Sequence, residues 1–359
     1  MNKIWVFLIF LLAPVLVFVF VAKGYADDSS IGIFDYQKEE IKRIDIESID
    51  AEIDEVAIDL RELSIKMTDI QTTVNEFEAV FSEYTTQINR SIESSRDQKY
   101  LSDDIYEQRI TRALGEPIDF YLSNSSEIKI FELKELGYRG YIAKIKLFDP
   151  DVFKLALAEG EIGKLETTSD AAIRTGAVLA INGGGFGAGR VNGELVSTMI
   201  GGAVVDGEMV KEFIPKSNED LFFVGINKKG DLVGDVPKSQ QEVEDMKPYQ
   251  GVSFIPILIK DGEKVTLPGA WAKTKHPRTI IGQYANDDLI VIVVDGRQGE
   301  YSAGITLERL QDKLLELGVK DAYNLDGGGS TAMYFNGKIL NKPSDGNERP
   351  VANNFIVLP

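Results

Sequence analysis

The sequence predicts an α+β fold: a domain of mixed β-sheet with few helices, preceded by a long coiled-coil helix and an N-terminal transmembrane helix. Residues 4–22 form an uncharged apolar run, residues 33–114 contain neither glycine nor proline, and short apolar runs separated by glycine turns follow residue 115. These patterns are typical of a membrane span, an uninterrupted helix and β-strands, respectively. The expected organisation is 1–26 for the transmembrane or signal segment, 33–98 for the coiled-coil stalk and 110–359 for the sheet domain.

Composition excludes several classes of site. The chain has 359 residues, of which 43% are hydrophobic, so it can bury a sizeable core. It has no cysteine, which excludes thiol catalysis, disulfides and thiolate metal sites, and its single histidine, His276, excludes a multi-histidine metal centre. The net charge of −18 argues against a nucleic-acid partner. Residues 27–110 hold 22 acidic and 9 basic side chains, so the acidity lies mainly there. We expect neither a cofactor nor a resident metal ion.

The first segment, 4–22, reads IWVFLIFLLAPVLVFVFVA and is flanked by Lys3 and Lys23. Its nineteen residues are enough to span a bilayer, and Pro14 is tolerable in such a helix. The alternative is a cleaved signal peptide, because residues 24–26 (GYA) resemble a small-x-small cleavage site. A signal core usually has about 7–15 apolar residues, so the length favours a retained anchor. We therefore expect a single-pass cell-membrane protein with its C-terminal domain outside the cell.

The stretch 33–114 predicts a helix with one apolar seam. Apolar residues recur at alternating spacings of three and four, which is typical of a coiled coil and predicts self-association. The alternative, one amphipathic helix lying on its own domain, would have a wider apolar stripe. Mixed side chains in the seam leave dimer or trimer open. The polar stretch 94–104 is expected to be a hinge. The seam is Ile46, Ile49, Ile53, Val56, Leu60, Leu63, Met67, Ile70, Val74, Phe77, Phe81, Tyr84 and Ile88.

Short strands and turns dominate after residue 115. Ser169 and Thr306 are expected to begin two helices, and Gly176 and Gly318 to end them. Asp-Gly and Asn-Gly pairs between apolar runs predict hairpins. We expect strands at 141–147, 153–158 and 354–358, helices at 169–175 and 307–317, and turns at 206–207, 227–230, 261–262 and 336–337.

Three strand ends share one pattern: a continuous apolar run, then Asn or Asp, then glycine. They are AVLAINGGGFG, LIVIVVDGRQG and AYNLDGGGS. Continuous apolar runs predict strands buried on both faces. If the three strands are parallel neighbours, Asn182, Asp295 and Asp326 meet at one edge of the sheet, where open sheets usually bind ligands.

The last of these loops has the strongest signal. Gly327, Gly328 and Gly329 would let a ligand approach the backbone, and their N–H groups could converge on an anion. Asp326 at the mouth of the loop is a natural proton donor or acceptor. A tight turn is the alternative, but Asp-Gly-Gly-Gly-Ser-Thr is more than a turn needs.

Basic and acidic side chains near these loops complete the pattern. Arg278, Arg297 and Arg349 carry planar forks that match a phosphate, although each alone could form a surface ion pair. Asp345 and Glu348 add two acids before the last strand.

The motifs INGGGF, HPRTIIG, VVDGR, GITLERL with NLDGGGSTAM, and PSDGNERPVAN occur in this order within 138–359. This arrangement resembles the phosphodiester glycosidase family, which includes the lysosomal uncovering enzyme and bacterial proteins linked to exopolysaccharide and cell-wall glycans. One departure is Gly185, before Phe186, where a bulky residue is expected. It bears on substrate preference more than on the chemistry.

The resemblance implies a hydrolase that cleaves the glycosidic bond of sugar-1-phosphodiesters in cell-surface or extracellular glycans. Phosphate leaves readily, so such a site needs charge stabilisation and a carboxylate that activates water or attacks the anomeric carbon. Asp326 is the expected catalytic carboxylate, with Asp295 or Glu348 as the second acid. The expected substrate- or phosphate-binding residues are Asn182, Gly183, Gly184, Arg278, Arg297, Gly327, Gly328, Gly329, Ser330, Thr331, Asp345 and Arg349.

Two other functions fit the same residues. A metal-assisted phosphodiesterase would use Asp295, Asp326 and Asp345 as oxygen ligands and cleave the P–O bond. A catalytically silent glycan-binding module could be displayed on the coiled-coil stalk. The spacing of the catalytic carboxylates, which would distinguish retention from inversion, cannot be read from the sequence.

Overall fold

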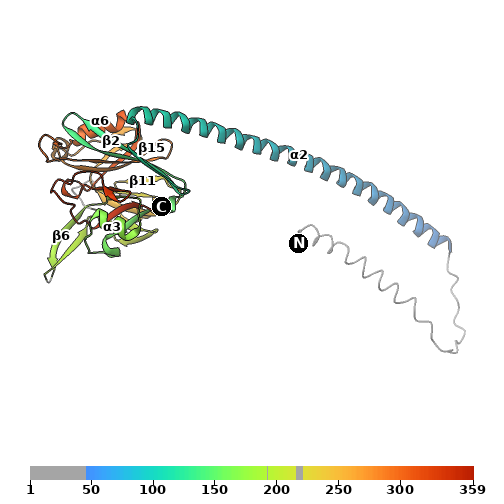
Figure 1. Ribbon diagram of the computed structural model, residues 1–359. Coiled ribbons are helices and arrows are strands. Elements are labelled where there is room, and N and C mark those ends of the chain that lie inside the picture. The colour runs from blue at the N-terminus through green and yellow to red at the C-terminus, as the bar shows by residue number, and fades with distance from the viewer. Residues whose placement is uncertain (1–45, 192, 216–220) are drawn as a thin grey trace. The chain divides into compact units, whose positions relative to one another are not determined.

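The computed structural model describes residues 46–191, 193–215 and 221–359 (Figure 1). The transmembrane helix predicted at 4–22 lies outside the described residues. Within the described part of the chain, no helix is both long enough and apolar enough to cross a membrane. The chain divides into two units, Met1–Asn89 and Arg90–Pro359.

Helix α2 (Ile46–Leu114) confirms that the stretch without glycine or proline is helical. The hinge expected at 94–104 is wrong, because the helix continues through it. Polar side chains do not end a helix by themselves when no glycine or proline is present. The helix ends before Gly115, whose φ of +82° is left-handed. The seam side chains from Ile53 to Ile88 keep between 44% and 70% of their surface exposed.

Within its described residues, the second unit contains three antiparallel sheets of five or more strands and one two-stranded hairpin, and the predicted α+β class with few helices is confirmed. The eight-stranded sheet has the order β1 (Asp119–Leu122), β2 (Ser126–Glu135), β3 (Tyr138–Leu147), β16 (Leu289–Val294), β15 (Arg278–Tyr284), β17 (Val319–Leu325), β13 (Ile257–Lys260) and β14 (Glu263–Lys264). One five-stranded sheet has the order β19 (Lys338–Ile339), β18 (Met333–Phe335), β5 (Leu179–Asn182), β20 (Asn353–Val357) and β4 (Phe153–Leu157). The other has the order β11 (Leu232–Asp235), β10 (Phe222–Ile226), β12 (Gln250–Phe254), β8 (Ala203–Val205) and β9 (Glu208–Lys211).

The remaining elements are short. Strands β6 (Phe186–Val191) and β7 (Glu194–Met199) form a separate hairpin. The helices are α3 (Thr168–Thr175), α4 (Gln240–Asp245), α5 (Gly269–Ala272) and α6 (Leu307–Glu316), with 3₁₀ turns η1 (Pro150–Val152), η2 (Ala158–Gly160) and η3 (Gly328–Ser330).

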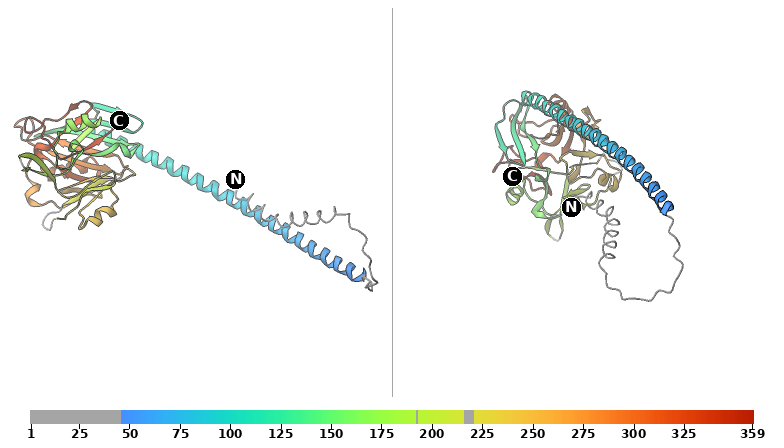
Figure 2. Two further views of the ribbon diagram at one scale, coloured as in Figure 1. Left: turned by 90° about the horizontal axis from the view of Figure 1, so that it is seen from below. Right: turned by 90° about the vertical axis from the view of Figure 1, so that its right-hand side faces the viewer.

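Strand β16 shows why its sequence, LIVIVV, is apolar throughout. Alternate side chains point to opposite faces of a strand, and here both faces are covered. Val291 and Val293 pack into the core shared with the other sheets, whereas Ile290 and Ile292 pack into a second core beneath α6. Helix α6 thus covers the outer face of the eight-stranded sheet, while the two five-stranded sheets supply strands to the inner core (Figures 1 and 2).

The last turns of α2 pack on this same sheet. Ile110 is buried in the core beneath α6. Glu107 accepts hydrogen bonds from Lys129 at 2.8 Å and Lys144 at 2.5 Å, and the buried Lys144 also contacts Asp288 at 2.5 Å. These residues all belong to the second unit. The packing of this unit therefore begins a few residues before 110, where the domain was expected to start.

The predicted turns and helix ends are largely confirmed. Asp206, Asp261 and Asn336 all adopt positive φ at the turns of three hairpins, and Thr306 caps α6 by accepting from Arg309 N at 3.2 Å. The cap of α3 was predicted wrongly, because Thr167 fills that position instead of Ser169.

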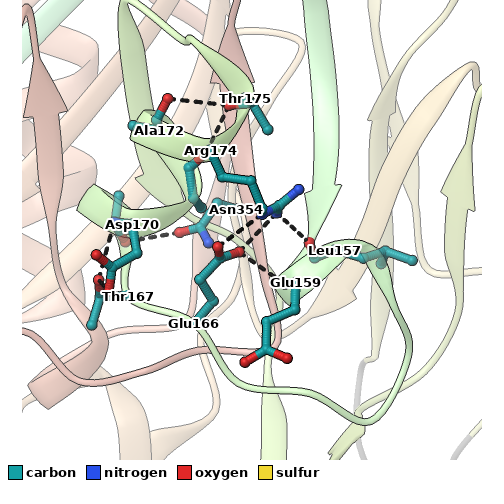
Figure 3. A network of polar contacts seen from close by, with 11 residues as sticks. Leu157, Glu159, Glu166, Thr167, Asp170, Ala172, Arg174, Thr175 and Asn354 are labelled. Atoms are coloured by element: carbon teal, nitrogen blue, oxygen red, sulfur yellow. Dashed lines mark hydrogen bonds and ion pairs between the residues drawn. The ribbon is translucent and has the colours of Figure 1, made fainter.

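Polar contacts fix α3 to its neighbours (Figure 3). Thr167 Oγ1 accepts from Asp170 N at 3.1 Å. The Arg174 side chain bridges the carboxylate of Glu166 and the carbonyl oxygen of Leu157, at 2.7 and 2.8 Å. These contacts hold both ends of the short helix, whose first turn carries Ser169, a hydrogen-bond donor to Glu348.

Candidate active site

The carboxyl ends of β16 and β17 lie at the same edge of the eight-stranded sheet. Both strands are antiparallel to β15, which lies between them, so they run in the same direction. Arg278, the first residue of β15, is opposite the end of β16, and Thr279 is opposite the end of β17. The structure therefore places Arg278 between the strand ends that carry Asp295 and Asp326.

Strand β5 does not join them, so the arrangement of three parallel neighbours was predicted wrongly. It pairs with β18 and β20 in another sheet. Asn182 at its end nevertheless reaches the same edge: its Oδ1 accepts from Thr279 Oγ1 at 2.7 Å and from Ala332 N at 3.1 Å, and its Nδ2 donates to the carbonyl oxygen of Asp326 at 2.6 Å. The fully buried amide ties the two sheets together and positions the backbone of Asp326.

The glycines after Asn182 are needed for close packing. Gly183 N donates to Asn353 O at 3.0 Å, and Gly184 N donates to Asn353 Oδ1 at 2.9 Å. A methyl group added at Gly183 would overlap the Asn353 side chain, and one at Gly185 would overlap the ring of Phe254. The last contact gives a structural reason for the third glycine. These glycine N–H groups are engaged within the protein, so their contact with substrate stays a prediction.

Asp326 is a buried carboxylate with an unusual affinity for protons. Burial raises its pKa to about 6, although the Ser330 hydroxyl, the N–H of Gly327 and the charge of Arg349 each oppose the rise. Gly327 N donates to Asp326 Oδ1 at 3.0 Å. Ser330 Oγ lies near the carboxylate without the geometry of a full hydrogen bond to any protein group. At neutral pH most of Asp326 is ionised, and a proton is readily exchanged.

The glycine loop does not present the converging N–H groups that the sequence suggested. Gly328 N donates to Pro277 O at 3.0 Å, and the N–H groups of Ser330 and Thr331 donate back to the loop at 3.2 and 3.3 Å. Instead, the missing side chains make room for guanidinium groups. A methyl group at Gly328 would lie 3.1 Å from Arg297 Nη2, and one at Gly329 would overlap Arg349 and Asp345.

Arg278 is the most unusual residue of the site. It is only 3% exposed, and none of the ion pairs found among the described residues includes it. Its Nη2 donates to Thr274 O at 3.1 Å, whereas its Nε has no partner. Burial, reinforced by the charge of Arg297, lowers its pKa to about 10. A buried arginine without an acid is costly unless an anion can bind it.

Two further arginines surround the loop. Arg297 has a left-handed backbone, with φ of +61°, and its Nη2 lies 3.2 Å from His276 Nδ1. Burial and the charges of Arg278 and Arg297 lower the pKa of His276, so its ring is neutral and can accept this hydrogen bond. Arg349 Nη2 donates to Asp345 Oδ2 at 2.8 Å.

Among the described residues, the buried polar atoms without a hydrogen-bond partner include Arg278 Nε, Ser330 Oγ and Thr331 Oγ1, which lie on segments adjoining Asp326. Buried polar groups are nearly always hydrogen-bonded in folded proteins. One guanidinium N–H and two hydroxyls without partners on adjoining segments are donors that a tetrahedral oxyanion would satisfy.

The other two predicted acids are engaged as supports. Asp295 is 1% exposed and accepts from Lys342 N at 2.9 Å, Asn341 Nδ2 at 3.1 Å and the Tyr301 hydroxyl at 3.2 Å. Burial raises its pKa, and these three hydrogen bonds oppose the rise. Glu348 accepts from Ser169 N at 3.0 Å and from Ser169 Oγ at 2.5 Å.

A cavity of about 470 Å³ lies beside these supports. Asn341, the partner of Asp295, lines it together with Glu348. The full lining is Gln298, Ile339, Asn341, Lys342, Pro343, Gly346, Asn347 and Glu348. Tyr301 and Asn341 were not singled out from the sequence, because neither stands in a glycine-rich strand end; only their contacts with Asp295 reveal them.

The acids are not arranged as metal ligands. Among the residues that the structure describes, no three His, Asp or Glu side chains converge on a point where a metal ion could bind. Asp295, Asp326 and Asp345 are therefore not gathered into one set of oxygen ligands.

The comparison with known families agrees with this geometry. The phosphodiester glycosidase family matches residues 175–358, which is just over half of the chain and includes every predicted site residue. The chain belongs to the phosphodiester glycosidase family.

Curated proteins are related to the chain at moderate distance. The chain is 32% identical over 199 residues to the uncharacterized prophage-derived protein YomE of Bacillus subtilis, covering 54% of this chain and 29% of YomE. It is 27% identical over 195 residues to mouse N-acetylglucosamine-1-phosphodiester alpha-N-acetylglucosaminidase, covering 50% of this chain and 36% of the mouse protein. It therefore spans about a third of the length of these curated relatives.

A solved structure shares this fold. The catalytic domain of the zebrafish N-acetylglucosamine-1-phosphodiester alpha-N-acetylglucosaminidase superposes with a TM-score of 0.54 at 22% identity, covering 66% of this chain and 84% of that one. At this identity the superposition supports the architecture alone.

Proposed function

We propose that this phosphodiester glycosidase is an exported, membrane-anchored hydrolase that cleaves the sugar C1–O bond of sugar-1-phosphodiesters in cell-surface or extracellular glycans. One observation carries the proposal: the buried Arg278, which lacks an acid partner, lies at the same sheet edge as the protonatable carboxylate of Asp326. The guanidinium of Arg278 is suited to bind a phosphate oxygen. The carboxylate of Asp326 is suited to act on the anomeric carbon beside it.

The cationic groups would stabilise the leaving phosphate. As the C1–O bond breaks, negative charge builds on the bridging oxygen, and Arg278 and Arg297 are placed beside the loop to neutralise it. The hydroxyls of Ser330 and Thr331 would donate to the remaining oxygens, which would satisfy their unpaired atoms. Because phosphate leaves readily once its charge is stabilised, this half of the reaction needs no strong general acid.

The carboxylate of Asp326 would act on the other side of the bond. At neutral pH it is mostly ionised, so it can either take a proton from attacking water or attack C1 itself. In both cases C1 gains a hydroxyl group from water, and the aglycone leaves as a phosphate monoester. Asp295 and Glu348 would contribute by holding the 341–342 backbone and the start of α3.

A labelling experiment on the full-length protein tests this function. A sugar-1-phosphate methyl diester is incubated with the protein in ¹⁸O-water, with and without chelator. Label in the sugar supports glycoside cleavage. Label in the phosphate, lost with chelator, would indicate the metal-assisted phosphodiesterase instead, and binding without any product would indicate the silent glycan-binding module. Arg278→Lys is the control, because it keeps the charge and loses the planar fork.

The proposal includes an oligomeric stalk. From Ile53 to Ile88 the seam of α2 is apolar at every a and d position, and all of these side chains are largely exposed in the single chain. A second copy of the same helix offers an apolar seam of identical spacing, which is the occupant that knobs-into-holes packing requires. The seam positions after Ile88 become polar, beginning with Ser91 and Ser95, so the pairing should end near the boundary between the two units.

A further inference from the structure

One carboxylate lies among the arginines of the site without an evident part in the chemistry. Asp345 Oδ2 accepts from Arg349 Nη2 at 2.8 Å, and a methyl group at Gly329 would overlap both of these atoms. Asp345 therefore lies directly on the glycine loop. The hydrogen bond from Arg349, helped by the charge of Arg297, lowers the pKa of Asp345, so it is ionised at neutral pH.

An ionised acid at this point reduces the attraction that the site offers to anions. Arg278, Arg297 and Arg349 supply three positive charges, and Asp326 and Asp345 subtract two when ionised. A phosphodiester carries one negative charge. A phosphate monoester carries nearly two above its second pKa of about 6, and its extra charge would be repelled by Asp345.

We propose that Asp345 is a specificity-determining residue that makes this site select phosphodiesters over phosphate monoesters, including the monoester that the reaction releases. The inference rests on the proposed function, since it assumes that the arginines bind the phosphate. Its consequence is that product release is favoured by charge: cleavage turns a monoanion that the site tolerates into a dianion that it disfavours.

A purely structural role for Asp345, holding Arg349 in place, makes a different prediction. Asp345→Asn keeps an oxygen that can accept from Arg349 and removes only the charge. Asp345→Ala removes both. If the residue only positions Arg349, the Asn variant should resemble wild type and the Ala variant should weaken both kinds of ligand alike.

The test is equilibrium binding of methyl phosphate and dimethyl phosphate to the full-length protein at pH 7.5. In wild type the diester should bind at least as well as the monoester. In Asp345→Asn the ratio of the two dissociation constants should move toward the monoester by about two- to fivefold, because the Asp345 side chain is 46% exposed and charge interactions at such sites are worth up to about 1 kcal/mol. Asp312→Asn, which removes the same charge from α6, is the control for net charge and should leave the ratio unchanged.

An unchanged ratio in Asp345→Asn, or an equal shift for both ligands, would overturn the inference, and so would a failure of the wild type to bind either anion. The proposed function is judged separately by turnover. If wild type cleaves the sugar-1-phosphodiester while the binding ratio does not respond to Asp345, only the charge selection fails. If the ratio responds and no sugar is released, the anion site is real and the catalytic proposal fails.

Discussion

Asp326→Asn should lower turnover by at least about 10²-fold and at the same time stabilise the protein at neutral pH. The pKa of Asp326 is about 6, against 3.8 for an unperturbed aspartate. Each pH unit between these values corresponds to about 1.4 kcal/mol, so complete ionisation costs the fold roughly 3 kcal/mol. Because the folded state binds this proton more tightly than the unfolded state, stability is lost as pH rises from about 4 through 6.

Asparagine resembles the protonated acid, so it removes that cost. Its Oδ1 can still accept from Gly327 N, and its Nδ2 can donate to Ser330 Oγ, which has no partner now. We expect the variant to gain about 1–3 kcal/mol at pH 7.5 and almost nothing at pH 4, where wild type is already protonated. For a unit of this size, that gain corresponds to a melting temperature higher by roughly 2–6 °C.

Two measurements check the argument: thermal melts at pH 4 and pH 7.5, and turnover of a sugar-1-phosphodiester at pH 7.5. Turnover should fall by at least about 10²-fold, the usual range for a general acid–base group. Asp345→Asn is the matched control, because Arg349 lowers the pKa of Asp345 and its removal should not stabilise the fold. A melting difference that is the same at both pH values would refute the burial argument, and normal turnover would refute the catalytic assignment.

Three further predictions address the rest of the structure. Arg278→Ala and Arg297→Ala should each lower kcat/KM on the phosphodiester by about 10²–10³-fold, since each removes a positioned charge; near wild-type kinetics in both would remove them from the site. Asn182→Ala should lower the free energy of unfolding by about 2–4 kcal/mol in a denaturant titration, because Thr279, Ala332 and Asp326 all lose a buried partner; Asn347→Ala, on the exposed rim of the cavity, is its control and should cost little. Replacing Leu60 and Leu63 with glutamate should leave the second unit folded and make the protein monomeric. Sedimentation of the full-length protein in detergent measures this, and a wild type that is monomeric at micromolar concentration would contradict the coiled coil.

Local patterns in the sequence were sufficient for elements that are decided by neighbouring residues. The absence of glycine and proline predicted α2, Asn-Gly and Asp-Gly pairs predicted the hairpin turns, and Thr306 predicted the start of α6. The apolar run of β16 predicted burial on both faces, because successive side chains of a strand point to opposite faces. The motif residues also indicated that arginines and Asp326 would lie close together.

Only the tertiary structure decided which of those residues are free to act. A run of apolar residues reports that a strand is buried but not which strands are its neighbours, so β5 was assigned to the wrong sheet and Asn182 was not recognised as a clamp between sheets. In the same way, an aspartate after a strand does not reveal its hydrogen bonds. Asp295 accepts hydrogen bonds from the distant 341–342 segment, whereas Asp326 is buried with few hydrogen bonds. Pairing and burial of side chains depend on residues far apart in the chain, and for that reason the unpartnered Nε of the buried Arg278 could be found only in the folded protein.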